Sequence, residues 1–112
     1  MLTACHKDED DIFTYADIVL NAGAGMTIEQ IQGTARITNL NSKEVTTTSD
    51  FDVATIRLSL VRSSYSVDAE GLVRYHDAPN KSYTKHMRAH SDYIDLSATG
   101  YNQTTIDILF LE

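Results

Sequence analysis

Apolar and polar residues alternate along most of this chain with a period of two, which is typical of β-strands that bury one face. In the first such stretch, residues 12–20, the positions that share the apolar face are Ile12, Thr14, Ala16, Ile18 and Leu20. Sustained helical periodicity is absent. Only residues 27–32 leave a choice between a short helical turn and the approach to the next strand.

Turn-forming residues divide the alternation into segments. Breaks are predicted at residues 21–25, 39–43 and 77–81, the last of which contains the only proline, and Gly71 is expected to end another strand. The final segment, with Ile106, Ile108 and Phe110, is the most apolar and predicts an interior strand. The pattern as a whole predicts an all-β fold, an antiparallel β-sandwich of seven to eight short strands.

Composition narrows the class of protein. The chain has 112 residues, 42% of them apolar, and a net charge of −7. We expect one domain over residues 12–112, preceded by a flexible acidic leader over residues 1–11. No stretch approaches the roughly 20 apolar residues of a membrane-spanning helix. The nine basic residues are scattered singly, which argues against a nucleic-acid partner.

The N-terminal residues carry the clearest motif. The only cysteine, Cys5, follows Leu2-Thr3-Ala4 and precedes a polar tract made of Lys7, Asp8, Glu9, Asp10 and Asp11. This arrangement resembles a bacterial lipobox, in which the cysteine becomes the lipidated first residue of the mature protein. The tract is similar to the short acidic tag that marks Bacteroides-type surface lipoproteins for export. The resemblance implies attachment to the outer membrane at the cell surface through Cys5.

A signal peptide needs an apolar run of about 7–15 residues before its cleavage site. Only Met1 to Ala4 stand before Cys5. The lipobox interpretation therefore expects a signal peptide upstream of the sequence given. The alternative is an accidental match around an ordinary thiol.

A second resemblance covers about a third of the chain, in residues 37–45, 56–60 and 65–71. These segments resemble the carboxypeptidase-regulatory-like, transthyretin-like sandwich domains of Bacteroides-type surface lipoproteins, which have an immunoglobulin-like architecture. The family usually has Asp-x-x-Gly where this chain has Asp50 to Val53, and Pro-x-Gly-x-Tyr where it has Val61 to Tyr65. The missing glycines leave the geometry of these turns open, because positive φ angles favour glycine.

The sequence contains few candidates for catalytic, metal-binding or ligand-binding residues. His86 and His90 are four residues apart, with Asp92 nearby, and on a helix they could share a zinc ion. The alternation predicts a strand there, so polar surface histidines are the competing interpretation, and we expect no metal and no cofactor. Tyr65, Tyr83, Tyr93 and Tyr101 are candidates for a binding surface, because tyrosine combines a large apolar ring with a polar tip. Core or rim positions on the strands are the alternative.

The resemblance implies a non-enzymatic, lipid-anchored surface module for binding or assembly, with a protein or glycan ligand, beside an outer-membrane nutrient-uptake system or within an adhesin. Two alternatives stay open. One is a fimbrial or adhesin subunit that pairs strands with a neighbour. The other is a small metal-dependent hydrolase that uses His86, His90 and Asp92.

Overall fold

The structure, a computed structural model, describes residues 12–77 and 81–111, and these residues form eight β-strands. The strands are β1 (Phe13–Asn21), β2 (Met26–Asn39), β3 (Val45–Thr48), β4 (Phe51–Asp52), β5 (Thr55–Val61), β6 (Ser63–Asp77), β7 (Ser82–Leu96) and β8 (Gly100–Leu111). The all-β prediction is confirmed. Cys5, the predicted lipidation residue, and the predicted export tag, Lys7 to Asp11, lie outside the described residues.

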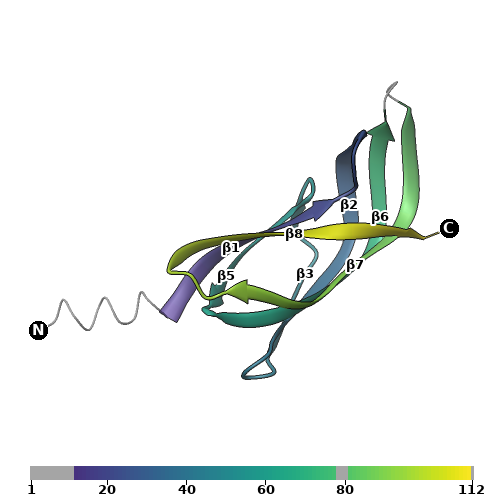
Figure 1. The fold of residues 1–112 in the computed structure, drawn as a ribbon. Helices are drawn as coiled ribbons and strands as arrows, with labels where there is room; N and C mark the ends of the chain where they lie inside the picture. Colours follow the sequence, from purple (N-terminus) through teal and green to yellow (C-terminus); the bar gives the residue numbers. More distant parts are fainter. Residues whose placement is uncertain (1–11, 78–80, 112) are drawn as a thin grey trace, which may run out of the picture.

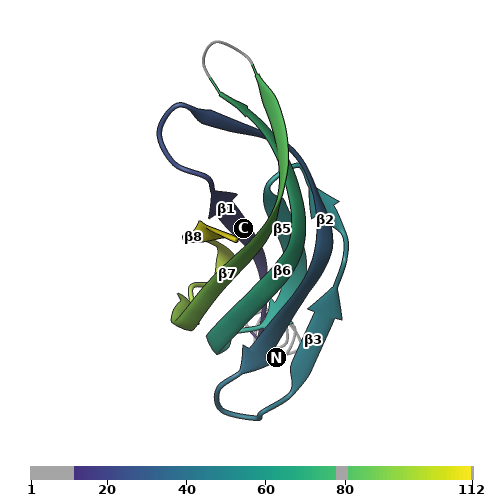
Figure 2. The same ribbon diagram turned by 90° about the vertical axis from the view of Figure 1, so that its right-hand side faces the viewer.

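The strands belong to one curled sheet with the order β3-β2-β6-β7-β8-β1-β5-β4. β2, β6 and β7 form a long curved layer, and β1 and β8 lie on its concave side (Figures 1 and 2). The short turn between β3 and β4 joins the two ends of this order. The sheet is thus a half-barrel, and the predicted antiparallel sandwich of two separate sheets is not what the strands form.

β8 connects the two halves of the curl. Its residues 100–107 pair with β1 in parallel, and its residues 108–111 pair with β7 in antiparallel fashion. The sheet is therefore mixed, which corrects the prediction of a purely antiparallel arrangement. The prediction that the last apolar run is an interior strand is confirmed, because β8 lies between β7 and β1.

Strand length is the second correction. β6 and β7 have 15 residues each and β2 has 14, although short strands were predicted. β6 runs straight through Gly71, which was expected to end a strand. Gly71 lies opposite Gly33, and a Cβ on either glycine would meet the backbone of the other strand at less than 3 Å. These glycines therefore allow a close approach of two backbones inside the sheet.

The core lines the inside of the curl. The inward positions of β1 are buried as predicted, with Ile18 fully inaccessible. Side chains from five other strands meet them there, among them Ile37, Ile56, Val67, Met87 and Ile106. Every described buried side-chain nitrogen or oxygen has a hydrogen-bond partner.

Among residues 12–77 and 81–111, the non-glycine residues with positive φ angles are Lys43 and Val53. Val53 occupies the β4–β5 turn at the position where the resembling family has glycine, and its φ is 57°. A β-branched side chain is strained in this left-handed region, at a cost of about 1–2 kcal/mol. The turn therefore has a left-handed backbone at Val53 although it lacks the glycine that favours this conformation.

Candidate functional site

The outer face of β8, β1 and β5 carries two tyrosines side by side. Tyr15 lies opposite Tyr101 on one neighbouring strand and opposite Ser59 on the other. The exposed fractions of the two tyrosines are 69% and 53%. With Asp17 and Arg57 they line a hollow of about 410 Å³, within the range of small-ligand sites.

An ion-pair network forms one wall of this hollow. The Tyr101 hydroxyl donates to Asp17 Oδ2 at 2.8 Å, and Arg57 Nε lies 3.3 Å from Asp17 Oδ1. Arg57 also donates to Asp52 through Nη1 at 2.7 Å. The hydrogen bond to Asp17 raises the pKa of the Tyr101 hydroxyl above its ordinary value. The tyrosine ring is thereby held in place by a charged acceptor.

A buried asparagine next to Tyr101 fixes the register of the two strands that carry the tyrosines. Asn102, the residue after Tyr101, is buried and donates to Thr14 Oγ1 at 2.9 Å, next to Tyr15. The same amide donates to the carbonyl of Ala98 and accepts from its N–H group. Because a shift of one residue would break these bonds, Asn102 is a positioning residue for the tyrosine pair.

The charge of the hollow limits its ligands. Arg57 is the one cation that lines it, and this side chain is already shared by two carboxylates. An anion would therefore meet a net negative wall. A neutral ligand would meet two ring faces, the oxygens of Asp17 and the hydroxyl groups of Tyr15 and Ser59, for which the described residues provide no hydrogen-bond partner.

The predicted histidine group only partly comes together. On β7, His86 and His90 project on the same face but lie four strand positions apart, or about 13 Å. A distance of that size is too long for one metal ion to bridge. His90 Nε2 lies 2.7 Å from Asp92 Oδ1, and its Nδ1 lies 3.7 Å from Asp68, which the sequence did not suggest. Within residues 12–77 and 81–111, no three His, Cys, Asp or Glu side chains are placed to hold a metal ion.

A serine, a histidine and a glutamate meet near the end of the β6–β7 hairpin. His76 Nδ1 and the Ser82 hydroxyl each lie 3.0 Å from the same oxygen of Glu29. Hydrogen bonds from Ser82 and His76 lower the pKa of Glu29. The described contacts include no Ser82–His76 hydrogen bond, so the histidine is not placed to activate the serine as a nucleophile.

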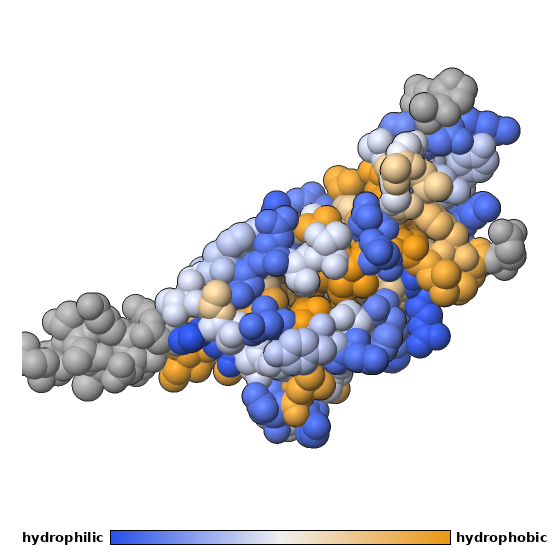
Figure 3. Space-filling view, in the orientation of Figure 1, coloured by the Kyte–Doolittle hydropathy of each residue, from blue (hydrophilic) through white to orange (hydrophobic). Residues whose placement is uncertain are grey.

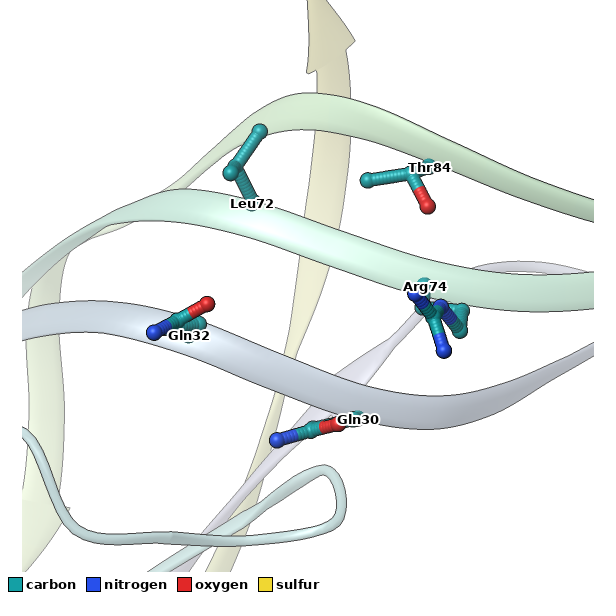
Figure 4. A pocket seen from close by; sticks show the side chains of 5 residues that line it. All are labelled: Gln30, Gln32, Leu72, Arg74 and Thr84. Carbon is teal, nitrogen blue, oxygen red and sulfur yellow. The ribbon is translucent and has the colours of Figure 1, made fainter.

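A second hollow, of about 200 Å³, lies on the outer face of β2, β6 and β7. Figure 4 shows the side chains that line it, Gln30, Gln32, Leu72, Arg74 and Thr84. Unlike the tyrosine hollow, this hollow has no carboxylate and no aromatic ring in its lining, and four of its five side chains carry hydrogen-bond donors. Apolar side chains gather instead near the end of β8 (Figure 3), where Leu109 is 62% exposed.

The predicted tyrosines have different surroundings. Tyr101 belongs to the hollow, whereas Tyr65 is buried and donates to the carbonyl of Val61. Tyr83 stacks on Tyr75 with ring centroids 5.4 Å apart. Tyr93 is exposed and accepts a hydrogen bond from Ser64. Tyr15 was missed, although the alternation of β1 already put it on the face opposite the core.

Comparison of the chain with protein-family models, with curated proteins and with solved structures gives no match. Within the described residues there is no helix of the length and apolarity that would cross a membrane.

Proposed function

We propose that this protein is a non-enzymatic binding module, tethered by lipid at the bacterial cell surface, that binds neutral carbohydrate in the hollow between Tyr15 and Tyr101. The observation that carries the proposal is the pair of exposed tyrosines held in register beside Asp17 and Arg57. A pyranose ring has an apolar C–H face that stacks on an aromatic ring. Its hydroxyl groups donate to a carboxylate and accept from a guanidinium.

The surface location is supported by the N-terminal motif. The resemblance of residues 2–11 to a lipobox with an acidic export tag agrees with a tethered module. Two or three acyl chains on Cys5 would hold the protein firmly, since each buried methylene contributes about 0.8 kcal/mol. Tyr15 follows this region closely in sequence, so the hollow would lie at the tethered end of the domain.

Carbohydrate binding is tested by isothermal titration of the folded protein with neutral oligosaccharides chosen from a glycan array. Tyr15→Ala should weaken binding by about thirtyfold, because losing about 80 Å² of stacked ring area costs about 2 kcal/mol. Tyr93→Ala is the matched control, since Tyr93 is also highly exposed, at 60%, but lies outside the hollow. Equal losses in the two variants, or no saccharide bound by the parent protein, would refute the proposal.

The tether is tested separately. The protein is expressed in a bacterial host with its natural upstream sequence and examined by mass spectrometry. A diacylglyceryl group on Cys5, lost in Cys5→Ser together with membrane attachment, is the expected result. An unmodified Cys5 thiol on a protein fully released from the membrane would refute the proposed surface attachment. It would not affect the proposal of carbohydrate binding.

A further inference from the structure

β2 has an edge that is open over more than half of its length. β3 pairs only with residues 35–38 of β2, while β6 pairs with β2 on its other side from Met26 to Asn39. No strand among the described residues pairs with the remaining edge, residues 26–34, although Ser49 lies beside Thr34 at its end, with the two hydroxyl oxygens 3.2 Å apart, and β4 also comes close to β2. The stretch contains neither lysine nor proline, residues that commonly protect such edges, and its β-bulge lies at Glu29, before the regular residues 30–33.

Backbone groups at two positions point toward this open edge. The N–H and C=O groups of Asn39 both bond to the β3 side, to Glu44 and Lys43. Backbone groups alternate between the two sides of a strand, and the β2–β6 register is regular from Asn39 back to Gln30. The amide and carbonyl groups of Ile31 and Gly33 therefore face the edge, ready to pair with an added strand.

The donor-rich hollow lies beside this edge on the outer face. Gln30 lies opposite Arg74 on β6, and Gln32 lies opposite Leu72 (Figure 4). An added strand would place outward side chains next to Gln30 and Gln32, with its backbone about 10 Å from that of Arg74. Two long side chains span this distance.

Arg74 is the cation that this surface offers. Among the described residues it has no ion pair, although its charge acts on Glu29. Glu29 already accepts hydrogen bonds from His76 and Ser82. The net charge of −7 opposes an acidic partner at long range, but salt screens it beyond about 8 Å under physiological conditions.

We propose that the open edge of β2 binds an extended peptide segment of a partner protein, with acidic side chains on its outward face and apolar side chains on its inward face. Backbone bonds to Ile31 and Gly33 supply the docking, and Arg74 with the amides of Gln30 and Gln32 selects carboxylates. On β6, Glu70 lies opposite Thr34 and points outward. Its charge disfavours an acidic side chain of the peptide beside Thr34, so carboxylates are selected only at the positions beside Gln30 and Gln32.

The experiment uses a seven-residue probe peptide that alternates valine and glutamate. Its matched control replaces each glutamate with lysine, and a second control carries N-methyl groups on alternate valine amides. Binding is measured by fluorescence anisotropy, and hydrogen exchange of the Ile31 and Gly33 amides is followed by NMR. Arg74→Gln is compared with Arg36→Gln, because Arg36 is also on the outer face but lies beside β3 and pairs with Asp68.

The glutamate probe is expected to bind and to protect the amides of Ile31 and Gly33, while the lysine and N-methyl probes bind at least about tenfold more weakly. Arg74→Gln should reduce affinity for the glutamate probe about tenfold, and Arg36→Gln should leave it unchanged. Equal binding of the glutamate and lysine probes, or binding without protection of the two amides, would overturn the proposal. Concentration-dependent protection without any peptide would also overturn it, since the occupant would then be a second copy of this chain.

Discussion

Replacing Gly71 with alanine should destabilise the fold strongly, because the added methyl group has no room. Its Cβ would lie 2.4 Å from the carbonyl oxygen of Gln32 and 2.5 Å from the Cα of Gly33. Both are backbone atoms of the facing strand, so no side-chain rotation relieves the contact. The φ angle of Gly71 is also positive, at 155°.

The size of the destabilisation follows from the steric contact of the added methyl group and from the positive φ angle. Overpacking a filled site costs about 1–3 kcal/mol, and a positive φ at a residue with a Cβ adds about 1 kcal/mol. We therefore expect Gly71→Ala to lower the free energy of unfolding by about 3 kcal/mol, a large part of the roughly 5–15 kcal/mol typical of a domain. The midpoint of thermal unfolding should fall by about 10–15 °C.

Urea and thermal unfolding followed by circular dichroism measure this difference. Gly100→Ala is the control, because Gly100 has a φ of 88° but nothing within 4 Å of an added Cβ. Gly100→Ala has the backbone strain of a positive φ without the steric clash. The alanine also reduces the conformational freedom of the unfolded chain, which offsets about 0.4–1 kcal/mol of the strain energy. A loss in Gly71→Ala no larger than the loss in Gly100→Ala would refute the close approach of β2 and β6.

Three further predictions concern the turn, the register and the hollow. Val53→Gly should raise the free energy of unfolding by up to about 1 kcal/mol in urea titrations, because relief of the strained φ exceeds the added chain entropy; a loss of stability would contradict the strain. Asn102→Ala should cost about 2–3 kcal/mol in the same assay, because it removes the hydrogen bond to Thr14 Oγ1 and both hydrogen bonds to the Ala98 backbone. Tyr101 should titrate above the usual tyrosine pKa in ultraviolet difference spectra, since its hydroxyl donates a hydrogen bond to the Asp17 carboxylate. Any stability from that bond is present at neutral pH and is lost as pH rises through the raised pKa, and Asp17→Asn should bring the titration back toward the ordinary value.

Much of the fold follows from period-two alternation alone. The faces of β1 and the interior position of β8 agree with the prediction, because a period of two is fixed by strand geometry. The stretch 27–32 looked ambiguous for a physical reason. A register shift between Ile28 and Gln30 inserts Glu29 as an extra residue, so the buried Ile28 and Ile31 are three apart, a spacing that a helix also produces.

The sequence alone predicts only half of the candidate site. Tyr101 was among the predicted binding residues, and the polar face of β1 already contained Tyr15 and Asp17. Their meeting depends on a parallel pairing between the first and last strands, which no local signal encodes. Gly71 does not end a strand as predicted, because glycine occurs both in turns and at close approaches of two backbones. Only the facing Gly33 distinguishes the two cases.

The parallel β1–β8 pair also has a consequence for how the chain folds. The bonds that close it join Asp17 to Tyr101 and Thr14 to Asn102, 84 and 88 residues apart in sequence. Contacts of such long range lose loop-closure entropy before they gain any contact energy, so folding in milliseconds to seconds is expected rather than in microseconds. Until residues 100–107 arrive, one edge of β1 stays unpaired and open to other chains. The time at which β8 is synthesised therefore determines how long β1 is exposed to misassembly.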